Sequence, residues 1–468
     1  MSTNKKKLYK NKEVKWTSRH GLIFSEIIAK FNDNKIRYFV LRNYDGLPNI
    51  NMTKDVDLII DPKRISEAIS ILKKVYKEQG ITFFYLVKFE QGHNCKGMCL
   101  NSKFSIHFDL MAGYFSRGCE TYTFDELYKQ TIKHKNFFVL NDLYNGIMIL
   151  IYKQFGYKKP FFSYDYKEII KLTNKKYPQF KQELIKLFGK KFGTQISNDI
   201  SLGNFDKILS YSSLFSKKLE FYCFRKAPIK TLIKKSKFYL EKVNRIIINY
   251  RKFAKVFSVI GPDGTGKSTF IDSLIKNLQF YYVDGKSDYR FNLYHFRPNI
   301  FPNLAMIGEN IGLKEQDKDF TNPHRAKPAN ILSSFLRIIY YWLDYVIGFN
   351  ILVRKDVWRD RYSIFDRYSY DLIVDPKRIR LNLPLFLRKF FVFMMPHPTI
   401  IFFLEADPKI IFQRKKELTL DEITNQNKIY KKLLQSYQNI INIDSNRPIE
   451  KSVNEATEII LKKFCESL

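Results

Sequence analysis

The sequence predicts an α/β protein in which a parallel sheet flanked by helices follows an N-terminal α+β domain with a helical companion. From residue 256 to the C-terminus, apolar runs typical of buried strands alternate with amphipathic segments, the pattern of a parallel α/β sheet. Between residues 36 and 110, shorter apolar runs are separated by turn signals such as Asp61-Pro62. A chain of 468 residues is too long for one ordinary core, so we expect two or three domains.

The order of these patterns divides the chain into five segments. They are a disordered basic tail (1–15), an α+β domain (16–122), a helical region (123–215), a basic helical linker (216–252) and a parallel-sheet domain (253–468). In the α+β domain, strands are expected at 36–41, 56–60, 83–89 and 104–110, with helices starting near 22 and covering 65–76. In the parallel-sheet domain, strands are expected at 256–260, 363–366, 399–404 and 440–443, with a mobile loop at 311–330.

The chain is strongly basic, with 80 Lys and Arg against 46 Asp and Glu and a formal net charge of +34. Such an excess favours anionic partners, although a coding bias towards Lys, Ile, Asn, Phe and Tyr contributes to it. The sequence contains neither an RNA-reading aromatic signature nor zinc-finger spacing, so nucleic acid is not an expected partner.

The five cysteines are scattered along the chain, which argues against a disulfide framework. A metal site can be imagined from His93, Cys95, Cys99 and His107. Their spacing is loose and no second cysteine pair follows, so ordinary thiols are the simpler interpretation.

No targeting or membrane segment is expected. Residues 1–15 are polar and basic and lack the apolar core of a signal peptide. The most apolar window, 331–353, is interrupted by Arg337, Asp344 and Asn350 and falls short of ~18 uninterrupted apolar residues. We therefore expect a cytoplasmic protein.

Residues 217–255 form a dense basic stretch with interleaved apolar residues, which predicts one or two amphipathic helices. Its only acidic residues are Glu220 and Glu241. A solvated helix between domains is the simpler interpretation of this stretch. The alternative is a surface that rests on an anionic membrane, which would make the protein peripheral to that membrane.

Residues 256–270 carry the most informative motif of the chain. An apolar run ends at Gly261, and Gly266-Lys267-Ser268 follow at the G-x-x-x-x-G-K-[ST] spacing. Glycines in such a loop let backbone N–H groups point at phosphate oxygens, the lysine reaches the β- and γ-phosphates, and the serine hydroxyl binds Mg²⁺. ATP and Mg²⁺ are therefore the expected cofactors, bound by Gly261, Asp263, Gly264, Thr265, Gly266, Lys267, Ser268 and Thr269.

Asp366 and Arg367 follow a buried strand, at the sheet edge where ligands of a parallel α/β sheet bind. Asp366 can hold Mg²⁺ through water or act on an acceptor hydroxyl, and Arg367 can clamp a phosphate. A salt bridge at the strand end is the alternative interpretation. A negative charge such as that of Asp263 is unusual in a phosphate-binding loop. Its presence is explained if the carboxylate reaches hydroxyl groups of the acceptor.

A basic cluster at Arg414, Lys415 and Lys416 follows the predicted strand at 399–404. It can close over the transferring phosphoryl group as a cationic lid. A solvated helix face is the alternative.

These motifs make residues 253–468 resemble the thymidylate kinase superfamily. The matching segments are the loop at 261–269, Asp366-Arg367-Tyr368, the strand end at 403–408 and the segment 443–448 before the last helix. The resemblance implies an ATP-dependent kinase in which Asp263, Asp366 and Arg367 address the acceptor. It also implies a base-contacting loop around Arg447 and an acceptor-binding role for Arg337.

Other features depart from a housekeeping thymidylate kinase. They are the segment 295–298, the aromatic run Tyr340-Tyr341-Trp342 and the large N-terminal extension. The match is closer to thymidylate kinase-like proteins that accompany bacterial surface-polysaccharide genes. The expected acceptor is therefore a small anion, either a nucleoside monophosphate or a phosphosugar or glycan end.

The N-terminal part contains a second candidate site. Asp55 and Asp57 lie on one face of a predicted strand, because side chains repeat every two residues, and Asp109 on a later strand can join them. Three carboxylates around two Mg²⁺ ions suit nucleotidyl transfer. Residues 38–60 resemble the entry to the nucleotidyltransferase superfamily, but residues 43–46 replace its usual Gly-Ser pair.

The sequence thus predicts a two-part enzyme. Its C-terminal half is a phosphotransferase in which Lys267, Asp366, Arg367 and Arg414 are catalytic, and its N-terminal half is a nucleotidyltransferase-like domain, active or only substrate-binding. The alternative is a non-catalytic ATP-binding scaffold or sensor associated with a membrane or nucleic acid. The oligomeric state is left open, with a homodimer as one alternative.

Overall fold

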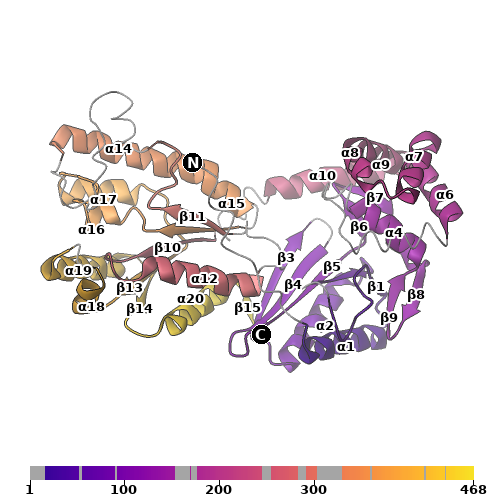
Figure 1. The fold of residues 1–468 in the computed structure, drawn as a ribbon, viewed down its shortest axis with the longest axis horizontal. Helices are drawn as coiled ribbons and strands as arrows, with labels where there is room; N and C mark the ends of the chain where they lie inside the picture. The colour runs from indigo at the N-terminus through magenta and orange to yellow at the C-terminus, as the bar shows by residue number, and fades with distance from the viewer. Residues whose placement is uncertain are drawn as a thin grey trace. The chain divides into compact units, whose positions relative to one another are not determined.

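The computed structural model describes residues 16–51, 55–89, 92–152, 169, 176–244, 255–282, 291–302, 329–358, 361–415, 418–437 and 439–468. The chain folds into two compact units (Figure 1), which are described separately: unit 1 is Met1–Val243 with Phe464–Leu468, and unit 2 is Asn244–Lys463. The expected tail at 1–15 and most of the expected loop at 311–330 lie outside the described residues.

Unit 1 is built on a mixed eight-stranded sheet with the order β15-β3-β4-β5-β2-β1-β9-β8. Strands β2 and β5 are parallel, as are β1 and β9, and the other neighbours are antiparallel. A separate hairpin joins β6 to β7. The strands are β1 Tyr38–Val40, β2 Asp55–Ile60, β3 Phe83–Phe89, β4 Gly92–Cys99, β5 Phe104–Met111, β6 Tyr114–Ser116, β7 Cys119–Tyr122, β8 Thr131–His134, β9 Phe137–Leu140 and β15 Glu466–Ser467.

Helices cover both faces of this sheet, and the alternation of side chains along each strand decides which core a residue joins. Tyr38 and Val40 pack with α1 and α2, whereas Phe39 and Ile59 pack with α4 and the helices that follow it. The helices are α1 Ser18–Asp33, α2 Ile65–Glu78, α3 Phe124–Tyr128, α4 Asp142–Ile151, α6 Tyr177–Phe188, α7 Lys190–Ser201, α8 Phe205–Ser210, α9 Ser212–Lys226 and α10 Pro228–Asn244.

The four strands expected in unit 1 are confirmed, but the region expected to be helical, 123–215, also contains β8 and β9. Both have four residues, too few for a periodic pattern to identify them. Strand β4 is absent from the expected set because two glycines interrupt it. A Cβ at Gly97 would lie 2.8 Å from the Tyr76 ring, so close packing, rather than a turn, explains that glycine.

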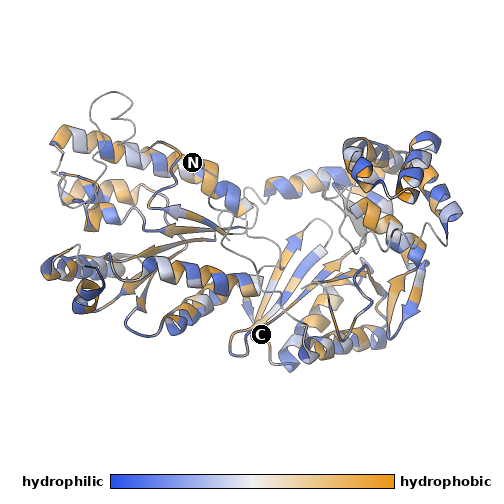
Figure 2. Ribbon diagram, viewed as in Figure 1, coloured by the Kyte–Doolittle hydropathy of each residue, from blue (hydrophilic) through white to orange (hydrophobic). Residues whose placement is uncertain are grey.

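Unit 2 is built on an all-parallel five-stranded sheet with the order β11-β12-β10-β13-β14. The predicted α/β class is confirmed, and its strands β10, β12, β13 and β14 match the expected positions within one residue. Figure 2 shows the hydrophobic runs of β10 and β13, which are buried almost throughout. The strands are β10 Val256–Ile260, β11 Phe291–His295, β12 Tyr362–Asp366, β13 Ile400–Glu405 and β14 Ile440–Asp444.

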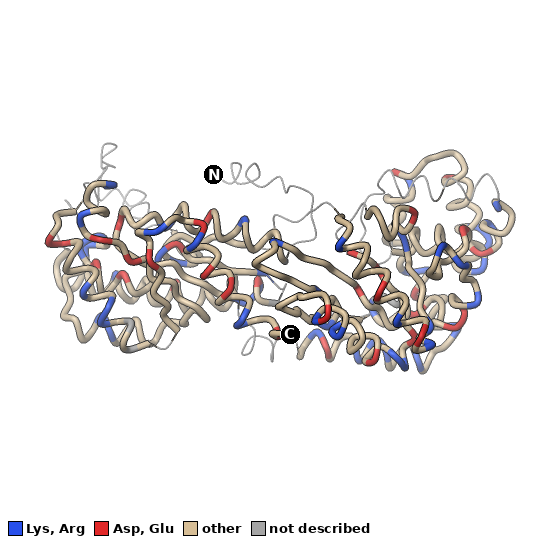
Figure 3. Tube along the Cα trace, turned by 90° about the horizontal axis from the view of Figure 1, so that it is seen from below, with Lys and Arg blue, Asp and Glu red and all other residues tan. Residues whose placement is uncertain are grey.

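Helices also cover both faces of this second sheet. Helices α14 and α19 share a core with Phe365 and Phe403, while α12 packs on Phe402 and bonds to α20 through Asn277 and Thr457, 3.0 Å apart. The helices are α12 Lys267–Tyr282, α14 Ile331–Gly348, the π-helix η5 Phe349–Val353, α15 Arg354–Trp358, α16 Asp371–Val374, α17 Leu385–Phe393, α18 Pro408–Arg414, α19 Leu420–Ser436 and α20 Ile449–Phe464. Figure 3 shows Lys and Arg positions in both units.

One continuous helical stretch, Ile331–Val357, is long and apolar enough to cross a membrane by length and composition, and 39% of its apolar window is buried. Arg337, Asp344 and Asn350, which interrupt this stretch, leave its average composition apolar. Its residues Ile338, Tyr345 and Val353 belong to the core of unit 2. Asp344, fully buried, forms an ion pair with Arg297 at 3.0 Å. These contacts are those of a core helix.

Candidate functional site

The glycine loop (residues 261–266) connects the end of β10 to the start of α12 at the carboxyl edge of the parallel sheet. Gly261 and Gly266 have φ angles of 145° and 86°, in a region that favours glycine. A Cβ at Gly261 would lie 2.8 Å from the carbonyl oxygen of Leu404, whereas one at Gly266 would meet nothing within 4 Å. Gly261 is therefore required both by its φ angle and by close packing. Gly266 is favoured by its φ angle alone, because the space around it is open.

The N-terminus of α12 lies directly after this loop. The 16-residue helix begins at Lys267, and Ser268 and Thr269 in its first turn are exposed. The first N–H groups of a helix have no partner within the helix, and the helix dipole places positive charge there. The exposed first turn is therefore suited to an anion such as a phosphate.

Lys267 is buried beneath the loop that it follows. Its Nζ donates hydrogen bonds to the carbonyl oxygens of Gly261 and Pro262, at 2.9 and 2.7 Å. Burial lowers the pKa of Lys267 to about 8, and the charge of Arg367 acts in the same direction while Asp263 opposes it. The ammonium is thus held by neutral oxygens and retains the capacity to bind a stronger acceptor.

Asp263 occupies the centre of a cluster of cations. It accepts hydrogen bonds from Arg367 and from Arg378, the latter at 2.5 Å, and its carboxylate lies 3.7 Å from Nζ of Lys267. Burial alone would raise the pKa of Asp263, but Arg367, Lys267, Arg378 and Lys415 hold it well below its usual range. Asp263 is therefore ionised, and both of its oxygens bind cations of the chain.

Arg367 links the glycine loop to the helices behind it. Besides Asp263, its guanidinium binds Asp371 at 2.6 Å, and the Tyr430 hydroxyl donates to the other oxygen of Asp371 at 2.9 Å. Arg367 has a φ of 71°, which is uncommon for a residue with a side chain, and its N–H donates to the carbonyl of Val259 at 2.9 Å. Positive φ values at non-glycine residues cluster at functional sites.

Asp366 lies beside Arg367 at the carboxyl end of β12. Its Oδ2 is 3.4 Å from Nδ1 of His295, which ends the neighbouring strand β11. Burial alone would raise the pKa of Asp366, but the hydrogen bond from His295 and the charges of Lys267 and Arg367 lower it overall. Asp366 is a carboxylate at neutral pH, as a metal ligand or a proton acceptor must be.

The proposed cationic lid lies partly against the glycine loop. A Cβ at Gly264 would lie 3.0 Å from the carbonyl oxygen of Ile411 and 3.2 Å from Cβ of Lys415, so the end of α18 covers this part of the loop. Arg414, the last residue of α18, is exposed. Lys416 lies outside the described residues.

The segment after β14 contacts the glycine loop through Ser445, which no sequence motif identifies. Ser445 donates to the carbonyl oxygen of Thr265 at 2.6 Å. We expected Arg447 to contact a nucleotide. In the structure it donates hydrogen bonds to two residues of the following helix α20, to Ser452 at 3.1 Å and to Glu455. A nucleotide base would have to compete with Glu455 for this arginine.

The segment after His295 is fixed to α14. Asp344 accepts hydrogen bonds from the backbone N–H of Phe301 at 2.8 Å and pairs with Arg297, so the chain that leaves β11 is held to the helix by a buried ion pair. Arg337, on the same helix, is half-buried, and its Nε has no hydrogen-bond partner among the described residues. The Nε–H group of Arg337 can thus donate a hydrogen bond to a bound acceptor molecule.

Unit 1 brings together the three carboxylates that the sequence singles out. Asp57 on β2 is the register partner of Asp109 on β5, and ligand oxygens of Asp55, Asp57 and Asp109 all lie within 4.8 Å of one another. Arg42 donates to Asp57 at 2.6 Å, and Asn94 donates to Asp109 at 2.6 Å. Hard carboxylate oxygens at this spacing suit Mg²⁺ or Mn²⁺, with Arg42 supplying part of the positive charge.

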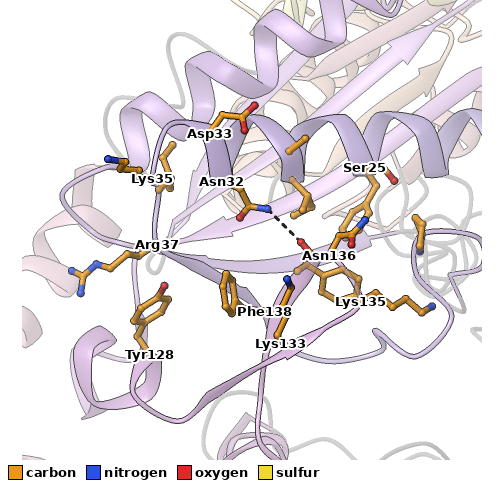
Figure 4. Close-up of a pocket in the computed structure, with 16 residues that line it drawn as sticks. Ser25, Asn32, Asp33, Lys35, Arg37, Tyr128, Lys133, Lys135, Asn136 and Phe138 are labelled. Carbon is orange, nitrogen blue, oxygen red and sulfur yellow. Dashed lines mark hydrogen bonds between the residues drawn. The ribbon is translucent and has the colours of Figure 1, made fainter.

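Unit 1 also contains a cavity of about 840 Å³ (Figure 4), and none of the three carboxylates lines it. It is next to Arg37, at the end of β1 that pairs with Ile60, whereas Asp55 begins β2 at the opposite end. Arg37 is paired with Asp61 at 2.6 Å, and Asn32 donates to the carbonyl of Asn136 at 3.3 Å. This cavity belongs to neither candidate site.

No protein-family model matches the chain, and no curated protein matches it significantly. The functional argument therefore depends on the geometry and electrostatics of the two sites.

The ionised state of Asp263 should make the stability of unit 2 depend on pH. Its folded pKa is depressed, so it contributes stability above the unfolded pKa of about 4, and this contribution is lost as the pH falls. Asp263→Asn should lower the free energy of unfolding at pH 7 by about 1–3 kcal/mol, and the pH dependence between about pH 5 and pH 2 should flatten. Urea unfolding followed by tryptophan fluorescence measures both quantities.

Asp421→Asn provides the control, because Asp421 is an exposed carboxylate in the first turn of α19 of the same unit. It should lower the free energy of unfolding by less than about 1 kcal/mol, through the lost interaction with the helix dipole, and it should not flatten the pH dependence. Equal stability and equal pH slopes for the two variants would contradict the assigned role of Asp263.

Proposed function

We propose that the protein is an ATP- and Mg²⁺-dependent phosphotransferase of the thymidylate kinase type. The observation that carries this proposal is the arrangement at the carboxyl edge of the parallel sheet. Buried Lys267 and the exposed first turn of α12 adjoin a glycine loop, and Asp366 and Arg367 end the neighbouring strand. The acceptor is a small anion, a nucleoside monophosphate or a phosphosugar or glycan end.

The triphosphate binds where the glycine loop meets α12. Backbone N–H groups there donate hydrogen bonds to the phosphates, and Lys267 exchanges its two carbonyl partners for phosphate oxygens, which are stronger acceptors for an ammonium. Ser268 and Asp366 are the oxygen donors suited to Mg²⁺. When bound, Mg²⁺ supplies charge neutralisation and a fixed orientation of the phosphates.

The acceptor lies on the side of Asp366 and Arg367. The γ-phosphoryl group forms a bond to an acceptor oxygen as its bond to the bridging oxygen of ATP breaks and ADP leaves, and Asp366 can take the proton where the acceptor oxygen belongs to a hydroxyl. Arg367 and Arg378 supply fixed positive charge beside the transfer path, and Arg414 and Lys415 add positive charge at the end of α18. Asp263 holds both arginines in place before substrates bind.

A second activity, metal-dependent nucleotidyl transfer, is favoured by the cluster of Asp55, Asp57 and Asp109. Two of these carboxylates face each other on adjacent parallel strands, which is the placement a metal site needs. Asn43, at the position of the absent Gly-Ser pair, has a φ of 55°, so the backbone there adopts a left-handed conformation even without glycine. The competing scaffold hypothesis predicts ATP binding without any transfer.

Lys267→Ala should reduce ATP turnover with the correct acceptor by about 100-fold or more, because a fixed cation at the transferring phosphates is lost. Lys276→Ala is the matched control, because Lys276 is exposed on the same helix. ADP release measured with a panel of nucleoside monophosphates and sugar phosphates tests both variants, and circular dichroism confirms their folding. Turnover that survives in Lys267→Ala would refute the kinase, and ATP binding without ADP release for any acceptor would favour the scaffold.

ATP binding should take up a proton above pH 8. In the nucleotide-free protein, Lys267 has a pKa of about 8 and loses its charge as the pH rises. Bound phosphates favour the protonated ammonium, so the lysine takes up a proton when ATP binds. The affinity for ATP should therefore fall by up to about tenfold per pH unit above this pKa. Calorimetry at pH 9 in buffers of different ionisation enthalpy measures the proton uptake, and Lys267→Arg, which stays charged, should abolish it. Equal uptake by both proteins would contradict this assignment.

Mn²⁺ should bind to unit 1 without nucleotide, and Asp55→Asn should weaken this binding by about tenfold or more. Asp206→Asn, which changes an exposed carboxylate of α8, should leave the affinity unchanged. Water-proton relaxation measures Mn²⁺ binding directly. Equal affinities in wild type and both variants would exclude a metal site at the three carboxylates.

A further inference from the structure

Helix α10 packs on unit 1 through one face only. Lys230 and Lys234 bind Glu120 at 2.7 and 2.9 Å, and Lys235 binds Glu220 at 2.8 Å. A Cβ at Gly118 would lie 2.5 Å from the backbone nitrogen of Lys235, so the helix backbone rests closely on the β6–β7 turn. These contacts fix which face of α10 points away from unit 1.

The opposite face of α10 is apolar and exposed. At about 100° per residue, its large apolar side chains fill an arc of about 120°, centred opposite the residues that contact unit 1. They are 48–73% exposed: Ile229, Leu232, Ile233, Tyr239, Leu240 and Val243. Among the helices in the described part of the chain, no other exposes as many large apolar side chains.

Lysines border this apolar face on both sides. On the same helical projection, Lys230 and Lys237 lie along one edge and Lys235 and Lys242 along the other. Lys237 and Lys242 are exposed. In residues 217–244 the basic residues are Lys217, Lys218, Arg225, Lys226, Lys230, Lys234, Lys235, Lys237 and Lys242, against Glu220 and Glu241. The face is thus an apolar stripe in a cationic border.

We propose that this face of α10 docks onto an anionic lipid surface. The helix lies in the plane of the membrane, with its apolar side chains at the boundary between headgroups and acyl chains and its lysines at the lipid phosphates. Lysine stems can follow apolar surface while the ammonium groups reach the phosphates.

Charge favours this occupant over a second copy of the chain. A symmetric contact between two copies brings the same patch against itself, so the lysine borders of the two helices would repel each other. Lysine is also depleted in protein interfaces, whereas it is enriched on the polar faces of interfacial helices.

Co-sedimentation of the full chain with vesicles tests the proposal. Wild type should bind phosphatidylcholine vesicles that contain about one third phosphatidylglycerol, bind poorly without the anionic lipid, and be released by salt. The triple variant Leu232→Ser, Ile233→Ser, Leu240→Ser should lose about tenfold or more in binding. Leu202→Ser is the matched control, because Leu202 is an exposed apolar residue of unit 1 outside α10, and it should bind like wild type.

A second variant, Lys237→Gln with Lys242→Gln, keeps the apolar stripe and changes only exposed residues. It should weaken binding by roughly fivefold for each lysine and reduce its salt dependence. Failure of wild type to bind anionic vesicles at low salt would overturn the proposal, as would equal binding by wild type and both multiple variants. A concentration-dependent dimer that the triple variant abolishes, without vesicle binding by wild type, would overturn it in favour of a second copy.

Discussion

The pairing of Arg367 with Asp263 and Asp371 is the interaction on which the site in unit 2 depends. The guanidinium is almost fully buried, and such a cation is tolerated only when it is paired and hydrogen-bonded. Asp263 belongs to the glycine loop, and Asp371 is bound in turn by Tyr430 of α19. A single side chain thus fixes the loop, the end of β12 and a distant helix relative to one another.

The parallel sheet explains why these groups meet. Parallel strands align their carboxyl ends at one edge, and the register pairs Val259 with Asp366 and Asp366 with His295. Strand β10 is central, and the strand order changes direction beside it, which is where ligands bind in open α/β sheets. The loop after β10 therefore lies between neighbours that can contribute charged side chains from both sides.

The sequence predicts those parts of the molecule whose signal is local. The strands β10, β12 and β13 of unit 2 are apolar runs buried on both faces, and the glycine loop is recognised by spacing alone. Arg378 and Tyr430 are not predictable in this way, because they are 115 and 59 residues from the carboxylates that they bind. The short β8 and β9, each with four residues, are similarly determined by their neighbours in the sheet rather than by a pattern of their own.

Asp263 now has a physical explanation that its position in the sequence does not provide. Lys267, Arg367, Arg378 and Lys415 would repel one another in a cluster without anions, and the carboxylate offsets part of that repulsion. Four cations face the three carboxylates Asp263, Asp366 and Asp371, so positive charge remains for phosphates. A carboxylate inside the glycine loop is therefore compatible with the proposed binding of a polyphosphate: it organises the cations in the free protein, and its two oxygens bind arginine side chains rather than backbone N–H groups of the loop.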